Sequence, residues 1–355
     1  MQKGRDQGID LLKCFAMLLV ICLHAGLARF QEVTVPSAIG VLEYAARLLF
    51  EGVPVFLVVN GYLMLGSRHF EIHRHFRKTA RLFVLLLFWM MFLTFVNSRI
   101  LQEPLPLTNY WYEVFHTQVG SRYDGQLWFL ENLLAVYLIY PVIRKLYDFD
   151  FHLFLYVFAL FAFFSVGMNT VGLVRDGIAL SHNTDLLNEA IGLICRFDPT
   201  GNAYYVYCFM LGGLIRRYRE EVIAKRKALI PAGFLAWALI TAIASYYSVR
   251  IGAPYMESCN YGSLAMTVMM LGMFALVLPH SSFKNPVLRL GAMAGQDTMG
   301  IFLIHFSFLD LWTMHVPLPD TIGYRVLEVV TVFLISWLVT LALKKIPGVR
   351  RLFLV

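Results

Sequence analysis

The chain alternates between long apolar runs and short polar connections. A helix that crosses a bilayer needs about 20 mostly apolar residues, and about ten stretches of the sequence come close to that requirement. These stretches are 9–28, 41–65, 80–101, 126–143, 151–170, 202–217, 228–247, 260–279, 294–315 and 322–343. The shortest two, 126–143 and 202–217, are the weakest predictions. The pattern predicts an all-α, polytopic membrane protein with about ten transmembrane helices.

The polar connections are too short to form a second domain. The sequence contains no long polar block, internal repeat or low-complexity tract. We therefore predict a single membrane domain over residues 1–355 and expect no fused extracytoplasmic domain. The first run ends in small residues, as a secretion signal does. Its apolar core is too long for a signal, however, and its polar residues are hard to explain in a discarded leader.

Composition excludes several other classes of protein. Hydrophobic residues make up 59% of the chain and charged residues 15%, whereas soluble domains are about 25% charged. These values exclude a water-soluble globule, a disordered chain and a disulfide-stapled secreted module. The five cysteines show no metal-ligand spacing. Cys195 and Cys259 both fall in segments predicted to face outward, which leaves a disulfide between them open.

The basic residues predict the orientation of the chain. The net charge is +7, but the basic residues form short clusters between apolar runs, where a polytopic protein keeps its cytoplasmic charges. We therefore expect no nucleic-acid partner. If the amino terminus is cytoplasmic, the inner connections hold most of the 30 lysines and arginines and every lysine. This distribution predicts a multi-pass protein of the inner (cytoplasmic) cell membrane with both termini in the cytoplasm.

Three ionisable residues, Asp10, Lys13 and His24, lie within the first apolar run. Each such residue costs about 2.5–3.5 kcal/mol to insert and is a functional candidate by default. The eleven-residue step from Lys13 to His24 is three helical turns plus about 20°, so both lie on one face, about 16 Å apart along the axis. This spacing suits a long ligand with its anionic head at Lys13 and its reactive end near His24. The alternative is a snorkelling lysine and a histidine bonded to a neighbouring helix.

Further polar residues fall at a similar predicted depth in the outer half of the bilayer. Arg47 and Glu51 form an i, i+4 pair, which is either part of a binding site or a structural ion pair. Glu131 begins the fourth predicted helix from the outside, and His305 and Asp310 lie in the ninth. Depth places these residues in one layer with His24, whereas their lateral positions do not follow from the sequence.

The segment from Gly66 to Arg81 is predicted to be a cytoplasmic loop. It carries five cations and three histidines, among them Arg68, Arg77, Arg81, His69, His73 and His75. We expect no metal site, because Glu71 is the only carboxylate that joins these histidines. A phosphate-binding mouth on the same side as Lys13 is one interpretation, and a plain topology signal is the other.

Short motifs follow one another along the chain in a recognisable order. The first helix reads Ile9-Asp10-Leu11-Leu12-Lys13 and, after ten residues, His24. The second reads Val53-Pro54-Val55-Phe56 and Asn60-Gly61-Tyr62-Leu63. The fourth opens with Leu-Trp-Phe-Leu at 127–130 and has Tyr140-Pro141 near its end, and the ninth contains Phe302-Leu303-Ile304-His305. Together these motifs resemble those of the acyltransferase-3 family of integral membrane acyltransferases.

Three positions depart from the family pattern. Lys13 stands where arginine is usual, Asn60 where serine is common and Gln126 where histidine is common. Lysine keeps the positive charge but loses the bidentate geometry of a guanidinium. The other two departures change the hydrogen bonding that is available in the site.

The resemblance implies transfer of an acetyl or similar short acyl group from cytoplasmic acyl-CoA (acetyl-CoA) to a hydroxyl of a cell-surface glycan or lipid-linked glycan precursor. No metal is expected. His24 would act as the base or as the carrier of the acyl group, with His305 or Glu131 orienting it. Lys13 would hold the coenzyme phosphates with three arginines, Arg68, Arg77 and Arg81. Further candidates for substrate binding are Arg47, Glu51, Asn60 and Trp128.

Two alternatives to these assignments remain open. Trp128 also fits the aromatic belt that marks the membrane interface. Ten spans with intramembrane histidines also suit a multi-pass transporter or flippase for a glycan or lipid-linked glycan. Such carriers often show a repeat between their halves, and none is evident in this sequence.

Overall fold

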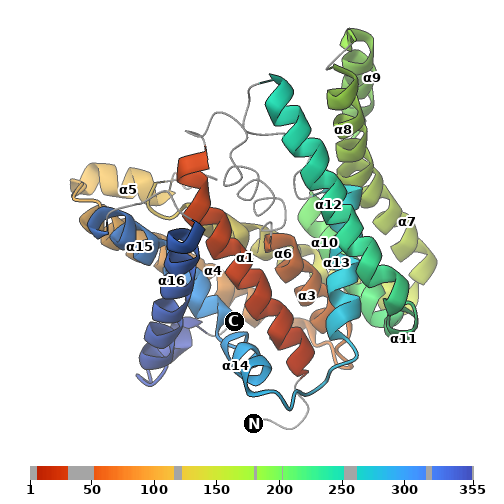
Figure 1. Ribbon diagram of the computed structural model, residues 1–355. Coiled ribbons are helices and arrows are strands. Elements are labelled where there is room, and N and C mark those ends of the chain that lie inside the picture. The colour runs from red at the N-terminus through yellow and green to blue at the C-terminus, as the bar shows by residue number, and fades with distance from the viewer. Residues whose placement is uncertain are drawn as a thin grey trace. The chain divides into compact units, whose positions relative to one another are not determined.

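The computed structural model describes residues 6–30, 52–115, 122–179, 182–201, 203–251, 262–316 and 322–353. All the regular elements in these ranges are helical, and no strand occurs among them (Figure 1). In chain order, the described α-helices begin with α1 (Gln7–Phe30), α3 (Val53–Leu65), α4 (Ile72–Ile100), α5 (Leu107–Phe115), α6 (Trp128–Phe149), α7 (Phe151–Ala162), α8 (Met168–Ala179) and α9 (Asp185–Cys195). The others are α10 (Tyr204–Arg217), α11 (Arg219–Ala224), α12 (Arg226–Ile251), α13 (Leu264–Val277), α14 (Pro286–Ala294), α15 (Thr298–His315) and α16 (Ile322–Leu343).

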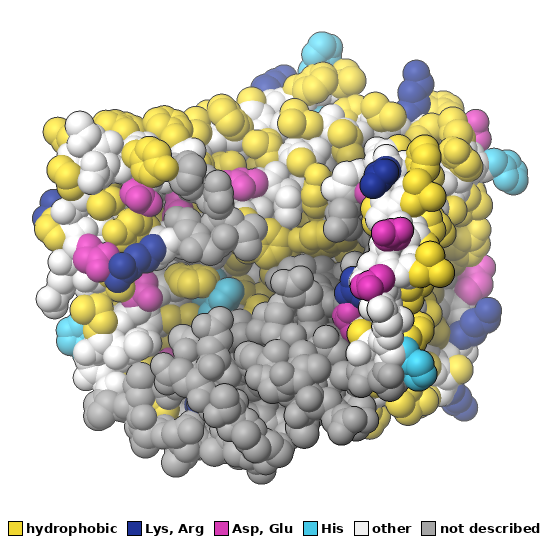
Figure 2. Space-filling view, turned by 90° about the horizontal axis from the view of Figure 1, so that it is seen from above, with side chains coloured by type: hydrophobic (Ala, Val, Ile, Leu, Met, Phe, Trp, Pro, Cys, Tyr) yellow, Lys and Arg dark blue, Asp and Glu magenta, His cyan; other side chains and the backbone are white. Residues whose placement is uncertain are grey.

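Five of the described helical segments are long and apolar enough to cross a membrane. They are Gln7–Ala25, Ile72–Ile100, Gly125–Phe149, Phe151–Ala179 and Gly323–Leu343, and two shorter apolar helices are Val53–Leu65 and Leu264–Val277. Many large hydrophobic side chains are exposed, and hydrophobic side chains make up much of the described surface seen in Figure 2. These features confirm the all-α membrane class, whereas the number of ten spans and the orientation of the termini stay predictions.

The start of α4 corrects the predicted loop at 66–81. The helix begins at Ile72, eight residues before the predicted run at 80–101. Its first turns are amphipathic, because exposed cations alternate with His75 and Thr79, which are buried. His75 Nε2 lies 2.8 Å from the Tyr137 carbonyl oxygen of α6. A search for long apolar runs misses such a segment, because its exposed face is charged and its buried face includes the polar residues His75 and Thr79.

The segment Phe151–Ala179 is one helical rod that extends past the predicted end at residue 170. A π-helical turn, Phe163–Gly167 (η2), joins α7 to α8. The Ser165 hydroxyl donates to the Phe161 carbonyl at 2.6 Å, and the Thr170 hydroxyl donates to the Val166 carbonyl at 2.6 Å. These side-chain bonds give partners to main-chain carbonyls around the wide turn.

The chain divides into two compact units, each built from two stretches of sequence. The first unit contains Met1–Ser67 and Val142–Ala292, and the second contains Arg68–Pro141 and Met293–Val355. The single domain over 1–355 stays a prediction. Of the predicted residues, Lys13, His24 and Asn60 belong to the first unit, whereas Glu131 and His305 belong to the second.

Glycines set the close packing of helices in the first unit. A Cβ at Gly61 of α3 would lie 1.8 Å from the Phe209 carbonyl oxygen of α10, and one at Gly212 of α10 would lie 2.0 Å from the Val58 carbonyl oxygen. The two backbones therefore touch, as small residues allow between membrane helices. α12 and α13 also run side by side (Figure 1).

The second unit holds α15 against α16 at several levels. Near the start of α15, Asp297 accepts hydrogen bonds from Trp337 Nε1 at 2.9 Å and from Lys344 Nζ at 2.5 Å. A Cβ at Gly300 would lie 2.2 Å from Thr340 Cγ2, so the helices are in contact there. Near the end of α15, Trp312 Nε1 donates to the Tyr324 hydroxyl at 2.6 Å.

Candidate active site

The amino-terminal turn of α1 is fixed by capping and by contacts within the first unit. Asp6 Oδ1 accepts from the main-chain nitrogens of Gly8 at 3.0 Å and Ile9 at 3.3 Å, which is the geometry of an N-cap. Burial raises the pKa of the Asp6 carboxyl against the effect of these two donors. Gln7 Oε1 accepts from the Phe283 main-chain nitrogen at 2.8 Å, which fastens the start of the helix to the segment before α14.

Lys13 is paired with a carboxylate of its own helix. Its Nζ lies 2.7 Å from Oδ1 of Asp10, an i, i+3 ion pair in which the Asp10 side chain is only 4% exposed. The pair explains how α1 carries two charges within an apolar run. It also fixes the position of the ammonium beside the Asp10 carboxylate.

His24 lies on the same uninterrupted α1 helix as Lys13. The helix extends from Gln7 to Phe30 without a break, so the predicted spacing of about 16 Å along one face holds. The His24 side chain is half-buried. His24 belongs to the first unit and His305 to the second.

Asn60 and Tyr62 lie on α3, which packs against α10. Asn60 Nδ2 donates to the Phe56 carbonyl of its own helix at 2.8 Å, and the side chain is half-buried. The Tyr62 hydroxyl accepts from Arg216 Nη1 at 3.2 Å, and the guanidinium lies 5.2 Å from the ring centroid. The structure thus gives Asn60 a local structural role and adds Arg216 to the residues around the family motif.

Arg144 holds the carboxyl end of α3. Its Nη1 donates to the carbonyl oxygens of Met64 and Leu65, both at 3.1 Å, and its Nε donates to Asp148 Oδ2 at 2.6 Å. The last carbonyls of a helix have no partner within the helix, and a cation there also complements the helix dipole. The structure therefore gives Arg144 an anchoring role at the end of α3.

His305 is completely buried near the middle of α15. Its relative exposure is 0%, and its Nδ1 lies 2.6 Å from the Phe302 carbonyl oxygen. Because a carbonyl oxygen only accepts, Nδ1 carries the proton in this bond, and Nε2 is the acceptor nitrogen of the neutral ring. The rings of Phe302 and Phe306 lie 5.9 Å and 5.0 Å from the imidazole. This environment fixes both the tautomer and the orientation of the ring.

Gln126 joins the start of α6 to α15 beside His305. It lies in a short 3₁₀ turn, Gly125–Leu127 (η1), that leads into α6. Its Nε2 donates to the Leu303 carbonyl at 3.4 Å, and the rings of Phe129 and Phe302 are 5.4 Å apart. Within the described part of the chain, the buried Oε1 of Gln126 has no hydrogen-bond partner. A buried amide oxygen of this kind is available to accept a bond from a ligand.

A second set of hydrogen bonds connects α15 to α4 and to the segment before α6. Ser307 donates from its hydroxyl to Asn97 Oδ1 at 2.6 Å, and Asn97 Nδ2 donates to the Tyr123 carbonyl at 2.5 Å. The Tyr123 hydroxyl in turn donates to Glu103 Oε2 at 3.3 Å. Neither Asn97 nor Ser307 was a predicted site residue. Their signal in the sequence is that both are polar and lie in or beside predicted spans.

Glu131 and Trp128 lie in the first turn of α6, and both are half-buried. The structure thus brings Trp128, Glu131 and Gln126 to one helix start and ties that start to α15 within two residues of His305. A carboxylate in the first turn also complements the helix dipole, so Glu131 has a structural interpretation beside the catalytic one.

The predicted phosphate-binding arginines are exposed and belong to the second unit. Arg68 precedes α4, and Arg77 and Arg81 lie on its first turns. Arg81 Nη2 donates to the Arg351 carbonyl at 3.1 Å, and Trp89 Nε1 donates to the Leu352 carbonyl at 3.1 Å. These bonds fold a short 3₁₀ turn, Val349–Phe353 (η4), back onto α4. The structure therefore adds Arg350 and Arg351 to the basic residues at this end of α4.

Several predictions fall outside the described residues. Arg47 and Glu51 are among them, and so is Cys259. Cys195, the other half of the disulfide left open by the sequence, is an exposed free thiol. Among the described residues, no group of three or more histidines, cysteines and carboxylates is arranged to hold a metal ion.

Comparison with known proteins identifies one family. The model of an acyltransferase domain, acyltransferase-3, matches residues 6–341, which covers nearly the whole chain and parts of both units. Neither the curated proteins nor the solved structures gave a match.

Proposed function

Because the chain belongs to the acyltransferase-3 family and is therefore a membrane acyltransferase, we propose that it transfers an acetyl or similar short acyl group from cytoplasmic acyl-CoA. The proposed acceptor is a hydroxyl of a cell-surface glycan or of its lipid-linked precursor. The proposed location is the inner cell membrane.

The arrangement on α1 is the observation that carries this proposal. Lys13 and His24 lie on one face of a continuous helix, separated by about 16 Å along its axis. An acyl-CoA is a long molecule with phosphates at one end and a thioester at the other. If its phosphates contact Lys13, its pantetheine arm extends along α1 toward His24. The Asp10 ion pair supports this placement, since it holds the Lys13 ammonium in position.

His24 is the proposed base. A sugar hydroxyl is a poor nucleophile near pH 7, and a histidine is the usual group to take its proton. The hydroxyl oxygen would attack the thioester carbonyl as its proton passes to the imidazole. The carbon–sulfur bond then breaks, and the coenzyme thiolate leaves and takes up the proton. A second route has the imidazole attack first, which releases the coenzyme and leaves an acyl-imidazole for the acceptor hydroxyl to attack.

The proposed positioning groups and the proposed polar contact for the acceptor belong to the second unit. The fixed tautomer of His305 gives the neutral ring an acceptor nitrogen at Nε2. Gln126 Oε1, which is buried and without a partner among the described residues, would accept a hydrogen bond from an acceptor hydroxyl. Glu131, in the first turn of α6, would orient the histidine or the acceptor. Trp128 in the same turn would stack on a sugar ring.

Arginines would complete the binding of the donor. Arg68, Arg77 and Arg81 carry exposed guanidinium groups, which suit bidentate contacts to phosphate. The carboxyl-terminal turn that Arg81 binds brings Arg350 and Arg351 to the same end of α4. Arg47 and Glu51 remain proposed contacts of the acceptor.

The experiment that tests the proposal uses the purified protein in liposomes with labelled acetyl-CoA and a lipid-linked glycan fraction. An acyltransferase releases free coenzyme and transfers label to the glycolipid. A transporter or flippase moves the glycolipid across the membrane and leaves the thioester intact. Transport without thioester cleavage would contradict the proposal, and so would thioester cleavage with no labelled glycan product.

A further inference from the structure

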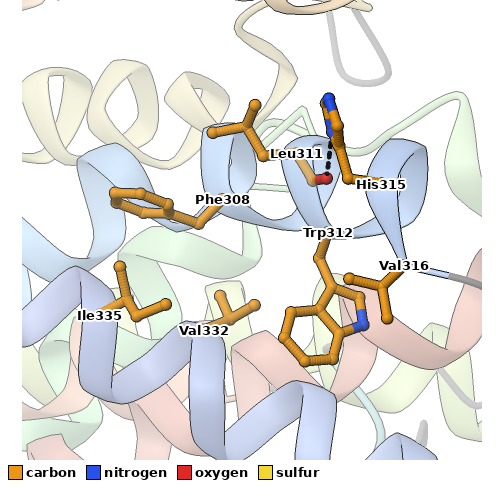
Figure 3. Close-up of a pocket in the computed structure, with 7 residues that line it drawn as sticks. All are labelled: Phe308, Leu311, Trp312, His315, Val316, Val332 and Ile335. Atoms are coloured by element: carbon orange, nitrogen blue, oxygen red, sulfur yellow. Dashed lines mark hydrogen bonds between the residues drawn. The ribbon is translucent and has the colours of Figure 1, made fainter.

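A groove lies between α15 and α16 of the second unit, near the carboxyl end of α15 (Figure 3). Its volume is about 330 Å³, which lies within the range of about 300–1,000 Å³ that is typical of small-ligand pockets. The residues that line it are Phe308, Leu311, Trp312, His315, Val316, Val332 and Ile335. The groove is independent of the residues that carry the proposed reaction.

The groove offers almost no hydrogen bonds to a ligand. Trp312 directs its Nε1 to the Tyr324 hydroxyl at 2.6 Å, and His315 Nδ1 lies 3.0 Å from the Leu311 carbonyl oxygen. Figure 3 shows the imidazole pointing away from the aliphatic and aromatic walls. A sugar or nucleotide placed here would lose its bonds to water without replacement, which is costly. The lining therefore favours a hydrocarbon chain.

The groove opens onto a surface that a bilayer would cover. α16 is one of the helices long and apolar enough to cross a membrane. Ile335 forms part of the groove and is also 37% exposed, beside Leu334 and Leu338, which are exposed apolar residues on the same helix. The groove is thus continuous with an apolar helix face, and the hydrocarbon that covers this face in a membrane is lipid.

One end of the groove carries the groups expected at a membrane interface. Trp312 and Tyr324 lie near the ends of their helices and are bonded to each other, as in the aromatic belts of membrane proteins. His315 is an exposed polar residue at the same end. A ligand that fits both parts has an apolar chain and a polar head.

We propose that the groove between α15 and α16 binds one acyl chain of a membrane phospholipid, with the headgroup at the His315 end. The groove begins at Phe308, three residues and about 4.5 Å of helix rise beyond His305. The bound chain therefore packs against the part of α15 that follows the buried histidine.

Photolabelling tests this site directly. The full protein is reconstituted in nanodiscs of phosphatidylethanolamine and phosphatidylglycerol that contain phosphatidylethanolamine with a diazirine on one acyl chain. After irradiation, mass spectrometry maps the labelled residues. We expect label concentrated on 308–316 and 332–335. Ile335→Trp fills the groove from α16, and Leu311→Trp fills it from α15, so each variant is expected to lose this label.

Leu334→Trp is the matched control, because it places the same ring next to Ile335 on a residue that does not line the groove. This variant is expected to keep the groove label. Size-exclusion profiles of all three variants exclude unfolding as the cause of any loss. Label spread evenly over the exposed face of α16, or groove label unchanged in both filled variants, would overturn the proposal. Displacement of the label by polyprenyl phosphate but not by excess phospholipid would also overturn the phospholipid assignment.

Discussion

The side-chain amide of Gln126 donates a hydrogen bond to the main-chain carbonyl of Leu303, at 3.4 Å and across 177 positions of sequence. Leu303 lies two residues before His305, so this bond fastens the start of α6 to the part of α15 that carries the buried imidazole. The same helix start presents Trp128 and Glu131. Gln126 therefore connects three of the residues that the sequence selects as candidates for the site.

Replacing Gln126 with leucine should weaken this connection while it keeps the side-chain volume. Loss of one hydrogen bond costs about 0.5–1.5 kcal/mol, and we expect a lower thermal midpoint together with reduced acyl transfer. Gln126→His should retain most of the activity, since an imidazole N–H can donate to the same carbonyl. The measurements are thermal unfolding in detergent and label transfer in liposomes. Full activity in the leucine variant would show that the bond does not position the site.

Asn97 should matter more for stability than its neighbour Ser98. Asn97→Ala removes the bonds to Ser307 and to the Tyr123 carbonyl and leaves buried partners unsatisfied. We expect a loss of about 1–3 kcal/mol of stability. Ser98→Ala is the control, because among the described residues the Ser98 hydroxyl bonds to the Phe95 carbonyl of its own helix and to no other helix, and we expect a smaller loss. The two thermal midpoints are compared in one detergent, and equal losses would argue against a bridging role for Asn97.

Hydrophobic patterning predicts those helices that are apolar over most of their length. The run predicted at 322–343 coincides with α16, and the run at 9–28 lies within α1. The start of α4 was missed because its first turns bury only one face, which includes His75 and Thr79. Of the second predicted run, 41–65, residues 41–51 lie outside the described residues, and the rest contains α3, which begins at Val53.

The sequence alone predicts many of the residues of the candidate site, but only some of the contacts among them. Asp10, Lys13 and His305 stand out as ionisable residues within apolar runs, and a local i, i+3 pair such as Asp10–Lys13 follows from helix geometry. The bond between Ser307 and Asn97 joins residues 210 positions apart. Bonds of this kind depend on how helices pack, which periodicity does not specify.

Lys13 should contribute to binding of the acyl donor. Lys13→Ala removes a charge-assisted contact, which is worth about 1.5–3 kcal/mol, and we expect the KM for acetyl-CoA to rise roughly ten- to a hundredfold. Lys13→Arg keeps the charge and should retain activity. Initial rates at varied donor concentration in liposomes provide the measurement. An unchanged KM in the alanine variant would reduce Lys13 to a structural partner of Asp10.

Cysteine accessibility should confirm the orientation. Cys195 is an exposed native thiol, and Cys259 falls in a segment predicted to face outward, so both are first replaced by serine to remove background labelling. Single cysteines at the exposed positions Arg77 and Lys345 should then be protected from an impermeant reagent added outside, whereas a cysteine at Asp185 should react. Permeabilised cells, in which all three positions react, are the control. Outside labelling at Arg77 would reverse the orientation and remove the proposed cytoplasmic donor site.

Acyl transfer by His24→Gln tests the central proposal most directly. Glutamine keeps a hydrogen-bonding group at the position but cannot take a proton near neutral pH. Loss of a general base typically lowers the rate by about 10²–10⁴, and loss of a covalent carrier would lower it further. The variant is purified, its amount and membrane insertion are matched to the unmodified protein, and label transfer to the lipid-linked glycan is measured. We predict near-normal protein levels with transfer reduced by at least about a hundredfold, whereas near-normal transfer would contradict the assignment of His24 and make His305 the next candidate.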